Sequence, residues 1–238
     1  RERPDTSAEF AYCWYVSEGT VAPLLVDEIR CNVEPTVYYR SIGFGNKNEA
    51  TLGAGSATTG STTVTGSGGT TWQTDNWGRG DRITIDSVTY TVATVLSNTS
   101  LTIASPFLGT TGSGKAYTIG RQFKGTTVLQ TWENCISGTS ACPYFPVTTS
   151  SLVSDNRREI GVVYDDGSAH TGTLDVDGST TDFVHSITLT VAEGDRHNGT
   201  PNTGAYVNSS TPSSSLSFSS RNATSRRASS STKVRTEA

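Results

Sequence analysis

The chain has 238 residues, a formal net charge of −4 and a hydrophobic fraction of only 33%. This charge argues against a nucleic-acid-binding surface, and no apolar run reaches the roughly 18 residues that a membrane-spanning helix needs. Much of the remaining sequence is Thr, Ser and Gly, which favours thin β layers with many loops over an enzyme with a thick helical core.

The first 45 residues are the most apolar part of the chain. Residues 8–19, 22–33 and 36–45 are predicted to be three strands, although the apolar spacing of the middle run also fits a short helix. The many aromatic side chains either stack on sugars or pack in a core or an interface. We expect Phe10, Tyr12 and Trp14 to pack between copies of the chain.

A stretch rich in Gly, Thr and Ser, residues 46–69, is predicted to be a linker that enters a strand at residues 62–65. Trp72 and Trp77 then bracket a loop. They either close the end of a small β layer or form, with Tyr90, an exposed row that binds glycans. Arg79-Gly80-Asp81 has the letters of a cell-adhesion tripeptide, but Gly80-Asp81 is the turn into the next strand.

The clearest pattern lies between residues 80 and 119. Ile83 and Ile85 alternate with polar residues, and the alternation returns at residues 88–92, 101–103 and 117–119. A period of two places one face of each strand in a core and the other in water. Turn residues separate the runs, so the segment is predicted to be a meander of short antiparallel strands.

The following segment is predicted to continue as strands. Residues 127–132 and 157–164 have the composition of strands. Residues 171–176 and 183–191 are predicted to pair as a hairpin, because Asp177-Gly178 between them is a strong turn signal.

Cysteine spacing indicates disulfides. The four cysteines are Cys13, Cys31, Cys135 and Cys142. They lack the paired CxxC spacing or nearby His residues of a zinc site, so disulfides in an oxidising compartment are the better interpretation. Three pairings are possible, and proximity in sequence favours Cys13 with Cys31 and Cys135 with Cys142.

The start at Arg1 and the lack of Met fit a removed leader or a trimmed sequence. We expect a secreted, extracellular or cell-surface protein.

Two stretches resemble known classes of protein. GSTTVTGSGGTTWQTDNWGRGD, followed by ITIDSVTYTVATVLSNTSLTIASPFLGTTGSGKAYTI, resembles a small β module of phage tail-fibre-type proteins and of large bacterial cell-surface proteins. TDFVHSITLTVAEGDRHNGTPNTGAYVN is similar to a segment of secreted bacterial surface proteins that continue into β-rich repeats. The resemblance implies a surface location and a structural role, and it brings no catalytic residue with it.

Little in the sequence points to catalysis or to a cofactor. The chain lacks the GxSxG, HExxH and P-loop patterns, and has no GxGxxG placed between a strand and a helix. Its three histidines would have to converge from separate loops to hold a metal. The acidic turns at residues 165–167 and 175–178 offer oxygen ligands that suit calcium, but ordinary Asp-Gly turns explain them equally well. Asn198-Gly199-Thr200 is one of four matches to the glycosylation acceptor pattern.

The Ser-rich tail, residues 211–238, has the composition of a disordered segment. We predict that residues 216–219 and 233–235 add as strands to an exposed sheet edge of the same or a neighbouring subunit. Leu216, Phe218 and Val234 would be the packing residues.

These patterns predict an all-β protein of antiparallel sandwich or meander modules, with long loops, two disulfides and an extended C-terminal tail. Its parts are an aromatic N-terminal segment (1–58), a central meander (59–120), a second β module (121–210) and the tail (211–238). We expect a non-catalytic subunit of an extracellular filament, pilus-like fibre or surface layer that assembles with copies of itself by strand addition. The alternatives are an adhesin module that binds cell-surface glycans and a phage tail or fibre protein. A polysaccharide-acting enzyme would need a pair of carboxylates in a cleft.

Overall fold

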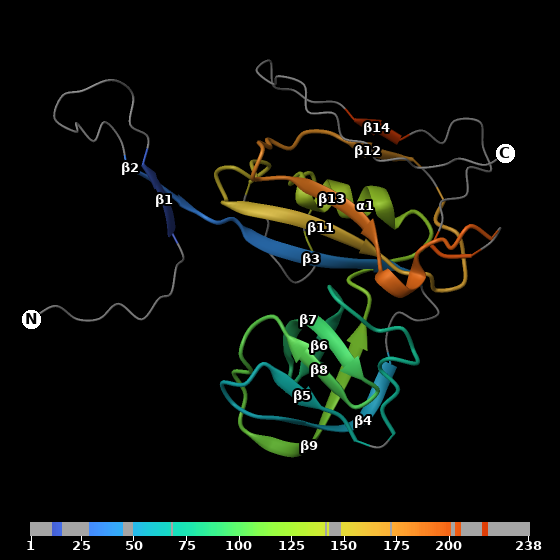
Figure 1. Ribbon diagram of the computed structural model, residues 1–238. Helices are drawn as coiled ribbons and strands as arrows, with labels where there is room; N and C mark the ends of the chain where they lie inside the picture. The colour runs from blue at the N-terminus through green and yellow to red at the C-terminus, as the bar shows by residue number, and fades with distance from the viewer. Residues whose placement is uncertain are drawn as a thin grey trace, which may run out of the picture.

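The chain folds into a closed β-barrel and a stack of parallel strands (Figure 1). The structure, a computed structural model, describes residues 11–15, 29–44, 50–67, 69–140, 142, 149–171, 173–200, 203–205 and 216–218. For residues 11–15, 29–33, 50–55 and 216–218 it describes the backbone alone. Its elements are mostly strands, with one α-helix. No helix in this part of the chain is long and apolar enough to span a membrane.

Six antiparallel strands close the barrel in the order β4-β5-β8-β7-β6-β9. They are β4 (Ala50–Ala57), β5 (Thr63–Thr65), β6 (Arg82–Ile85), β7 (Val88–Ser97), β8 (Ser100–Ile103) and β9 (Gly112–Gly120). The predicted alternation in β6–β9 is confirmed, because the following residues are buried in one core: Ile83, Ile85, Tyr90, Val92, Leu101, Ile103, Tyr117 and Ile119.

The barrel replaces the predicted sandwich or open meander because of β4. This strand lies in the stretch that was predicted to be a linker, yet it pairs with both β5 and β9 and so closes the sheet on itself. Segments 1–58 and 59–120 therefore both supply strands to the barrel. The sequence of β4, ATLGAGSA, is too rich in small residues to show a clear apolar alternation.

The second part is a four-stranded parallel sheet in the order β10-β3-β11-β13. Its strands are β3 (Thr36–Gly43), β10 (Phe123–Lys124), β11 (Arg157–Val163) and β13 (Ile187–Val191). The whole barrel is inserted between β3 and β10, which are neighbours in this sheet with Phe123 opposite Ile42. The predicted strands at residues 36–45 and 157–164 are confirmed, but the antiparallel arrangement expected for them is wrong.

Residues 127–132 form a helix, not the predicted strand. Helix α1 (Val128–Ile136) buries Val128, Leu129, Trp132, Glu133, Cys135 and Ile136. This spacing of three and four residues is the period of a helix, and it becomes visible only when the window extends to Ile136. The apolar face of α1 packs in one core with residues of β3, β10, β11 and β12.

The predicted hairpin at Asp177-Gly178 is also wrong. Strand β12 (Leu174–Val176) pairs with β14 (Leu216–Phe218), whereas β13 pairs with β11, both in parallel. Gly178 does turn the chain, with a φ of 76°. The residues after it then pass around the core, where Thr180 forms a parallel bridge with Ser151.

The parallel pairings recur along the chain as successive coils. Thr180 lies opposite Ser151 and Ile187 opposite Glu159, which are offsets of 29 and 28 residues. Leu216 lies opposite Leu174, an offset of 42 residues that includes a longer connection. Parallel pairing of successive segments resembles the stacking of coils in a β-solenoid, although the offset between β12 and β14 is longer than the other two. The first coil contains β11 and β12, the second contains β13 and β14, and α1 lies between the two sheets (Figure 1).

The cysteine pattern agrees with the structure where the structure describes it. Cys135 and Cys142 form the predicted disulfide. Strands β1 (Ala11–Tyr15) and β2 (Ile29–Val33) form an antiparallel pair that places the backbone of Cys13 opposite that of Cys31.

We expect Gly80→Ala to weaken the contact between barrel and sheet. A Cβ at Gly80 would lie 2.7 Å from Ser41 N and 2.9 Å from Arg40 C, and its φ of +88° strains any other residue. Gly60 is the matched control, since it has a φ of +79° but nothing within 4 Å of the added atom. In urea unfolding, Gly80→Ala should cost about 3–5 kcal/mol and Gly60→Ala about 1–2 kcal/mol. An equal loss of unfolding free energy in the two variants would show that Gly80 is not packed closely against the backbone of Arg40 and Ser41.

Loss of the Cys135–Cys142 bridge should lower the free energy of unfolding by about 2–3 kcal/mol, because the closed loop is short, with a sequence separation of 7. The double variant Cys135→Ala and Cys142→Ala, measured in urea without reductant, tests this while leaving the other two cysteines intact. Because Cys135 is 0% exposed, the single variant Cys142→Ala serves to separate loss of the bridge from loss of packing at Cys135.

Candidate assembly site at the open end of the parallel strands

The core beneath the parallel strands is covered unevenly along the stack. At the β3 end, Ile42 and Trp132 are 0% exposed and Phe123 is 2% exposed. In the second coil, Ile187, Leu189 and Val191 pack against the same core but remain only partly buried. The core is therefore closed at the β3 end and partly open at the β13 end.

The outer edge of β13 presents unpaired backbone groups. The Ser186 carbonyl accepts a hydrogen bond from Glu159 N–H (3.0 Å), and Ala192 N–H donates to the Val163 carbonyl (2.9 Å). Bonding direction alternates along a parallel strand. The N–H and C=O groups of Ile187, Leu189 and Val191 accordingly point away from β11. Among the residues that the structure describes, no strand pairs with this edge, so it is a template for another strand.

Exposed apolar side chains precede β13 in the same coil. Phe183 is 97% exposed and Val184 is 43% exposed. Their turn is ordered by Asp182, whose Oδ1 accepts hydrogen bonds from the N–H groups of Val184 (2.9 Å) and His185 (2.7 Å). His185 Nε2 in turn lies 3.0 Å from Asn156 Oδ1 in the first coil. The turn is thus fixed while its largest side chain is left in solvent.

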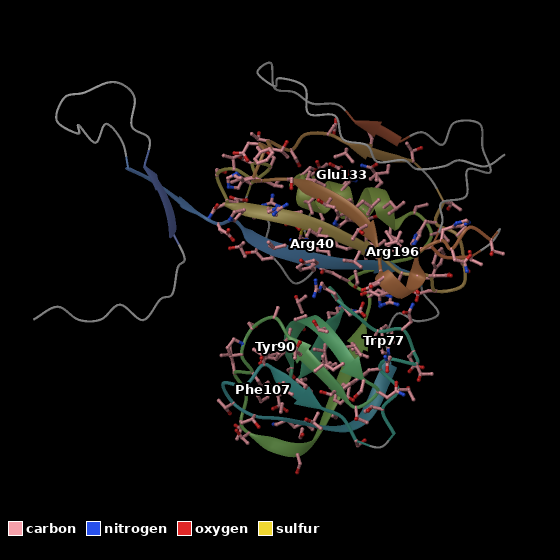
Figure 2. All side chains as sticks on the ribbon, viewed as in Figure 1. Arg40, Trp77, Tyr90, Phe107, Glu133 and Arg196 are labelled. Carbon is pink, nitrogen blue, oxygen red and sulfur yellow. A yellow bond between two sulfur atoms is a disulfide. The ribbon has the colours of Figure 1, made fainter. Side chains whose placement is uncertain are left out.

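The closed end is held by a polar cluster on α1. Glu133 is 1% exposed and accepts hydrogen bonds from Gln130 Nε2 (3.0 Å) and Asp177 N–H (3.3 Å) (Figure 2). Gln130 Oε1 accepts a hydrogen bond from Asp175 N–H (2.7 Å). Burial, reinforced by the negative charges of Asp177 and Asp175, raises the pKa of Glu133 to about 7. These contacts attach α1 to the β12 turn.

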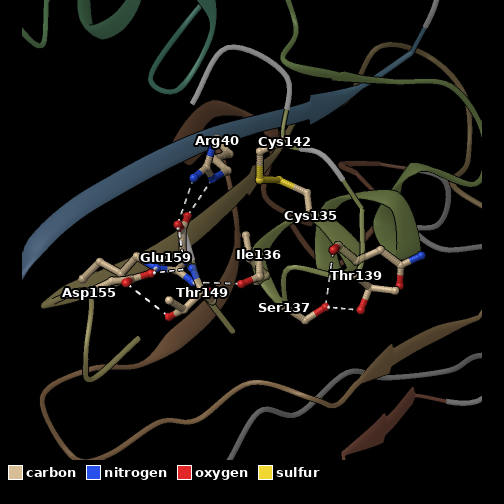
Figure 3. The surroundings of a disulfide bond; sticks show 11 residues. Arg40, Cys135, Ile136, Ser137, Thr139, Cys142, Thr149, Asp155 and Glu159 are labelled. Carbon is tan, nitrogen blue, oxygen red and sulfur yellow. Dashed lines mark hydrogen bonds and ion pairs between the residues drawn. A yellow bond between two sulfur atoms is a disulfide. The ribbon is translucent and has the colours of Figure 1, made fainter. Parts of the chain in front are cut away.

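A buried ion network joins the strands to the loop after α1. Arg40 of β3 contacts Glu159 of β11 through two hydrogen bonds of 2.7 and 2.9 Å (Figure 3). Glu159 also accepts a hydrogen bond from Arg157 Nη1 (2.7 Å). Arg157 Nη2 then donates to the carbonyls of Ile136 and Thr149. The network ties the first coil to the segment around the disulfide.

A second buried network fixes the barrel to the sheet. Arg121 is 0% exposed, and its guanidinium donates to Asp81 Oδ2 (2.8 Å), to both carboxylate oxygens of Asp166 (2.8 and 3.1 Å) and to the Asn76 carbonyl (2.9 Å). The guanidinium also lies 3.7 Å from the centre of the Tyr164 ring. Burial opposes its charge, but Asp81 and Asp166 more than offset this, so the pKa of Arg121 is raised.

The predicted glycan-binding row does not form. Trp72, Trp77 and Tyr90 are 0%, 5% and 3% exposed, because they are part of the barrel core. Figure 2 shows Tyr90 inside the barrel and Trp77 at the barrel end nearest the sheet. In the tripeptide at residues 79–81, Gly80 and Asp81 are buried, with Asp81 at 0% exposure, and only Arg79 is exposed. Neither feature offers an exposed recognition surface.

The predicted assembly residues are placed in part. Leu216 and Phe218 lie in β14, opposite Leu174 and Val176, so this segment of the tail adds as a strand within its own chain. Tyr12 and Trp14 lie in β1. Phe10, Val234 and residues 233–235 lie outside the described residues.

In the first acidic turn, residues 165–167, both carboxylates contact other groups of the protein. Asp166 binds Arg121, and Asp165 Oδ1 accepts a hydrogen bond from Gly167 N–H. Within the described ranges, no group of three or more His, Cys, Asp or Glu side chains is arranged to hold a metal ion.

Sequence reasoning missed Arg121, Glu159 and the open edge of β13. The two charged residues bond partners 40–119 positions away, and no local pattern marks such a pair. A strand was predicted at residues 183–191 as one arm of a hairpin, and β13 covers residues 187–191, but its partner is β11 and not the predicted one. Comparisons with protein-family models, with curated proteins and with solved structures find no match to this chain.

We expect Glu133→Gln to change how stability depends on pH. The pKa of Glu133 is raised from 4.5 to about 7 in the folded protein. Between these values the folded chain holds a proton that the unfolded chain has released, so wild-type stability falls as the pH rises. The Glu133→Gln variant has no carboxyl group at this position, so its unfolding free energy does not fall in this way as the pH rises. The difference in unfolding free energy, variant minus wild type, should increase from pH 4.5 to about pH 7 and then stay constant. A constant difference throughout would contradict the assignment.

Proposed function

We propose that this chain is a non-catalytic structural module of an extracellular filament or cell-surface layer, in which copies join by adding strands to the β13 end of the parallel stack. One observation carries the proposal: within the described residues, the second coil combines a strand edge that has no partner strand with a half-covered apolar core. Coils of a solenoid bury their apolar faces against neighbours, and an open parallel edge supplies the hydrogen bonds for the next strand.

The β3 end of the sheet is partly covered by contacts within the chain, and these contacts set the direction of the proposed assembly. There β10 pairs with the end of β3, and Ser41 N–H donates to the Gly80 carbonyl of the barrel (3.1 Å). Helix α1 covers the core behind these strands. These contacts occupy residues 41–43 of the β3 edge, whereas no strand within the described ranges pairs with any part of the outer β13 edge, so strand addition is directed to β13.

The strand that adds comes from the β1–β2 pair of a neighbouring copy. This pair stands away from the barrel and from α1 (Figure 1). A two-stranded ribbon alone is marginally stable in water, so it gains from joining a larger sheet. A contact between the β1–β2 pair of one copy and β13 of the next uses two different surfaces, and such a contact builds an open chain of subunits. The Cys135–Cys142 bridge supports an oxidising location.

The test compares two exposed apolar residues that differ in position. Phe183 precedes β13 and is 97% exposed, whereas Leu108 follows β8 in the barrel and is 77% exposed. Because both side chains are in solvent, Phe183→Asp and Leu108→Asp should fold like the wild type. We expect wild type and Leu108→Asp to form oligomers in native mass spectrometry and filaments in negative-stain images. Phe183→Asp should shift strongly toward monomer.

Leu189→Lys provides a second test, because it places a charge at the partly open core without touching the barrel. Circular dichroism and urea unfolding of each variant establish that it is folded. A wild-type chain that stays monomeric at high concentration would refute the proposal, and so would folded Phe183→Asp and Leu189→Lys chains that assemble as the wild type does.

A further inference from the structure

The loop after β13 contains Asn198-Gly199, the one Asn-Gly dipeptide of the chain. It lies beside Arg196 in the loop that Figure 2 labels, and Asn198, Gly199 and Thr200 are all exposed. Asn-Gly is the dipeptide in which the backbone nitrogen of the second residue is least hindered, because glycine has no Cβ. The hydrogen bonds around this dipeptide bring together a base (His197), a nucleophile (the Gly199 nitrogen) and two hydrogen-bond donors (Thr200 N–H and the Thr203 hydroxyl).

The nucleophile and the base are in contact. Gly199 N–H donates to His197 Nδ1 at 2.9 Å. An Nδ1 atom that accepts this hydrogen bond presents its lone pair to the Gly199 N–H. The imidazole is thus within proton-transfer distance of the backbone nitrogen.

The electrophile is Cγ of the Asn198 side chain, and hydrogen bonds hold this side-chain amide beside the Asn198–Gly199 peptide bond. Asn198 Oδ1 accepts a hydrogen bond from Thr200 N–H at 2.9 Å, which closes an Asx turn across Gly199. The Thr203 hydroxyl lies 2.8 Å from Asn198 Oδ1 and 2.7 Å from the Thr200 carbonyl, between which it shares its one proton. Both donors point at the oxygen that becomes negative when the amide carbon is attacked.

We propose that this loop is a self-modification site, at which His197 promotes conversion of Asn198 to a succinimide and then to aspartate or isoaspartate. Gly199 N bonds to Asn198 Cγ while His197 Nδ1 takes the nitrogen's proton, and the C=O electron pair moves to Oδ1. As the carbonyl re-forms, the Cγ–Nδ2 bond breaks, and Nδ2 leaves as ammonia with the proton from His197.

Water completes the reaction. Its addition at Cγ breaks the Cγ–N bond and yields aspartate, whereas its addition at the Asn198 backbone carbonyl breaks the peptide bond to Gly199 and yields isoaspartate. The net change is one water consumed and one ammonia released. The product adds a negative charge to the loop whose Asp195 carboxylate binds Asn76 Nδ2 of the barrel (2.8 Å) and Asp165 N–H (2.8 Å).

The rest of the loop keeps these groups in place. Ala205 N–H donates to the Asp195 carbonyl (2.9 Å), which closes the loop at its base. Gly204 approaches so closely that an added Cβ would lie 2.6 Å from His197 N. The arrangement depends on folding, and this separates it from the intrinsic reactivity of an Asn-Gly peptide.

The experiment measures deamidation of Asn198 by peptide mapping and mass spectrometry during incubation at neutral pH. The folded wild-type chain is compared with the same chain in guanidinium chloride, which retains the dipeptide but loses the loop. We expect the folded chain to react about tenfold faster or more, a modest value for general-base assistance. His197→Gln should reduce the folded rate to that of the unfolded chain.

Two further variants locate the effect. Thr203→Val should slow the reaction by a smaller factor, because Thr200 N–H remains as a donor. Arg196→Gln changes the adjacent exposed residue and should leave the rate unchanged. An equal or slower rate in the folded chain would overturn the proposal, and so would a His197→Gln chain that keeps the wild-type rate.

Discussion

The arrangement of the two parts depends on the buried guanidinium of Arg121. The barrel is inserted between β3 and β10. The two chain segments that connect it to the sheet would not by themselves fix its orientation. Arg121 instead bonds Asp81 of the barrel and Asp166 beyond β11 while its face stacks on Tyr164. A buried ion pair contributes little net stability, but removal of one partner leaves an uncompensated charge in the interior. The network thus restricts the barrel and the sheet to one relative orientation. The close approach of Gly80 to Ser41 restricts this orientation further.

In the assembly proposed above, this docking would determine which end of the parallel stack grows. With the barrel placed against β3, the sheet has a covered end and an uncovered one, and α1 reinforces the asymmetry by filling the core behind β3 and β12. Under the same proposal, the inserted barrel would have a physical role without a ligand, because it would allow the stack to grow at one end and not at the other. The barrel itself needs no neighbour, since closure pairs its own edges.

Local patterns predicted the local structure and failed where distant segments meet. The alternation around Ile83, Tyr90 and Leu101 predicted the barrel strands because each strand has one buried face. Strand β11 was predicted from its composition, but its parallel partners are set by contacts 28 and 121 residues away. The helix was missed because its β-branched start resembles a strand until Cys135 and Ile136 reveal the helical period. Gly178 gives a real turn, yet a turn signal does not say whether the chain reverses beside itself or passes around a core.

The two cores differ in how completely the chain can cover them by itself. The barrel core is closed on all sides by its own strands, whereas the second core ends at the partly exposed Ile187, Leu189 and Val191. Around that second core the chain concentrates its other constraints: the disulfide, the network of Arg40, Glu159 and Arg157, and the Glu133 cluster. These constraints lie on the closed side of the core, away from the β13 edge at which we propose that another copy binds. Since a partner that binds only the folded state stabilises it by mass action, the proposed assembly would also stabilise the parallel stack, and the Arg121 network would link the barrel to that stack.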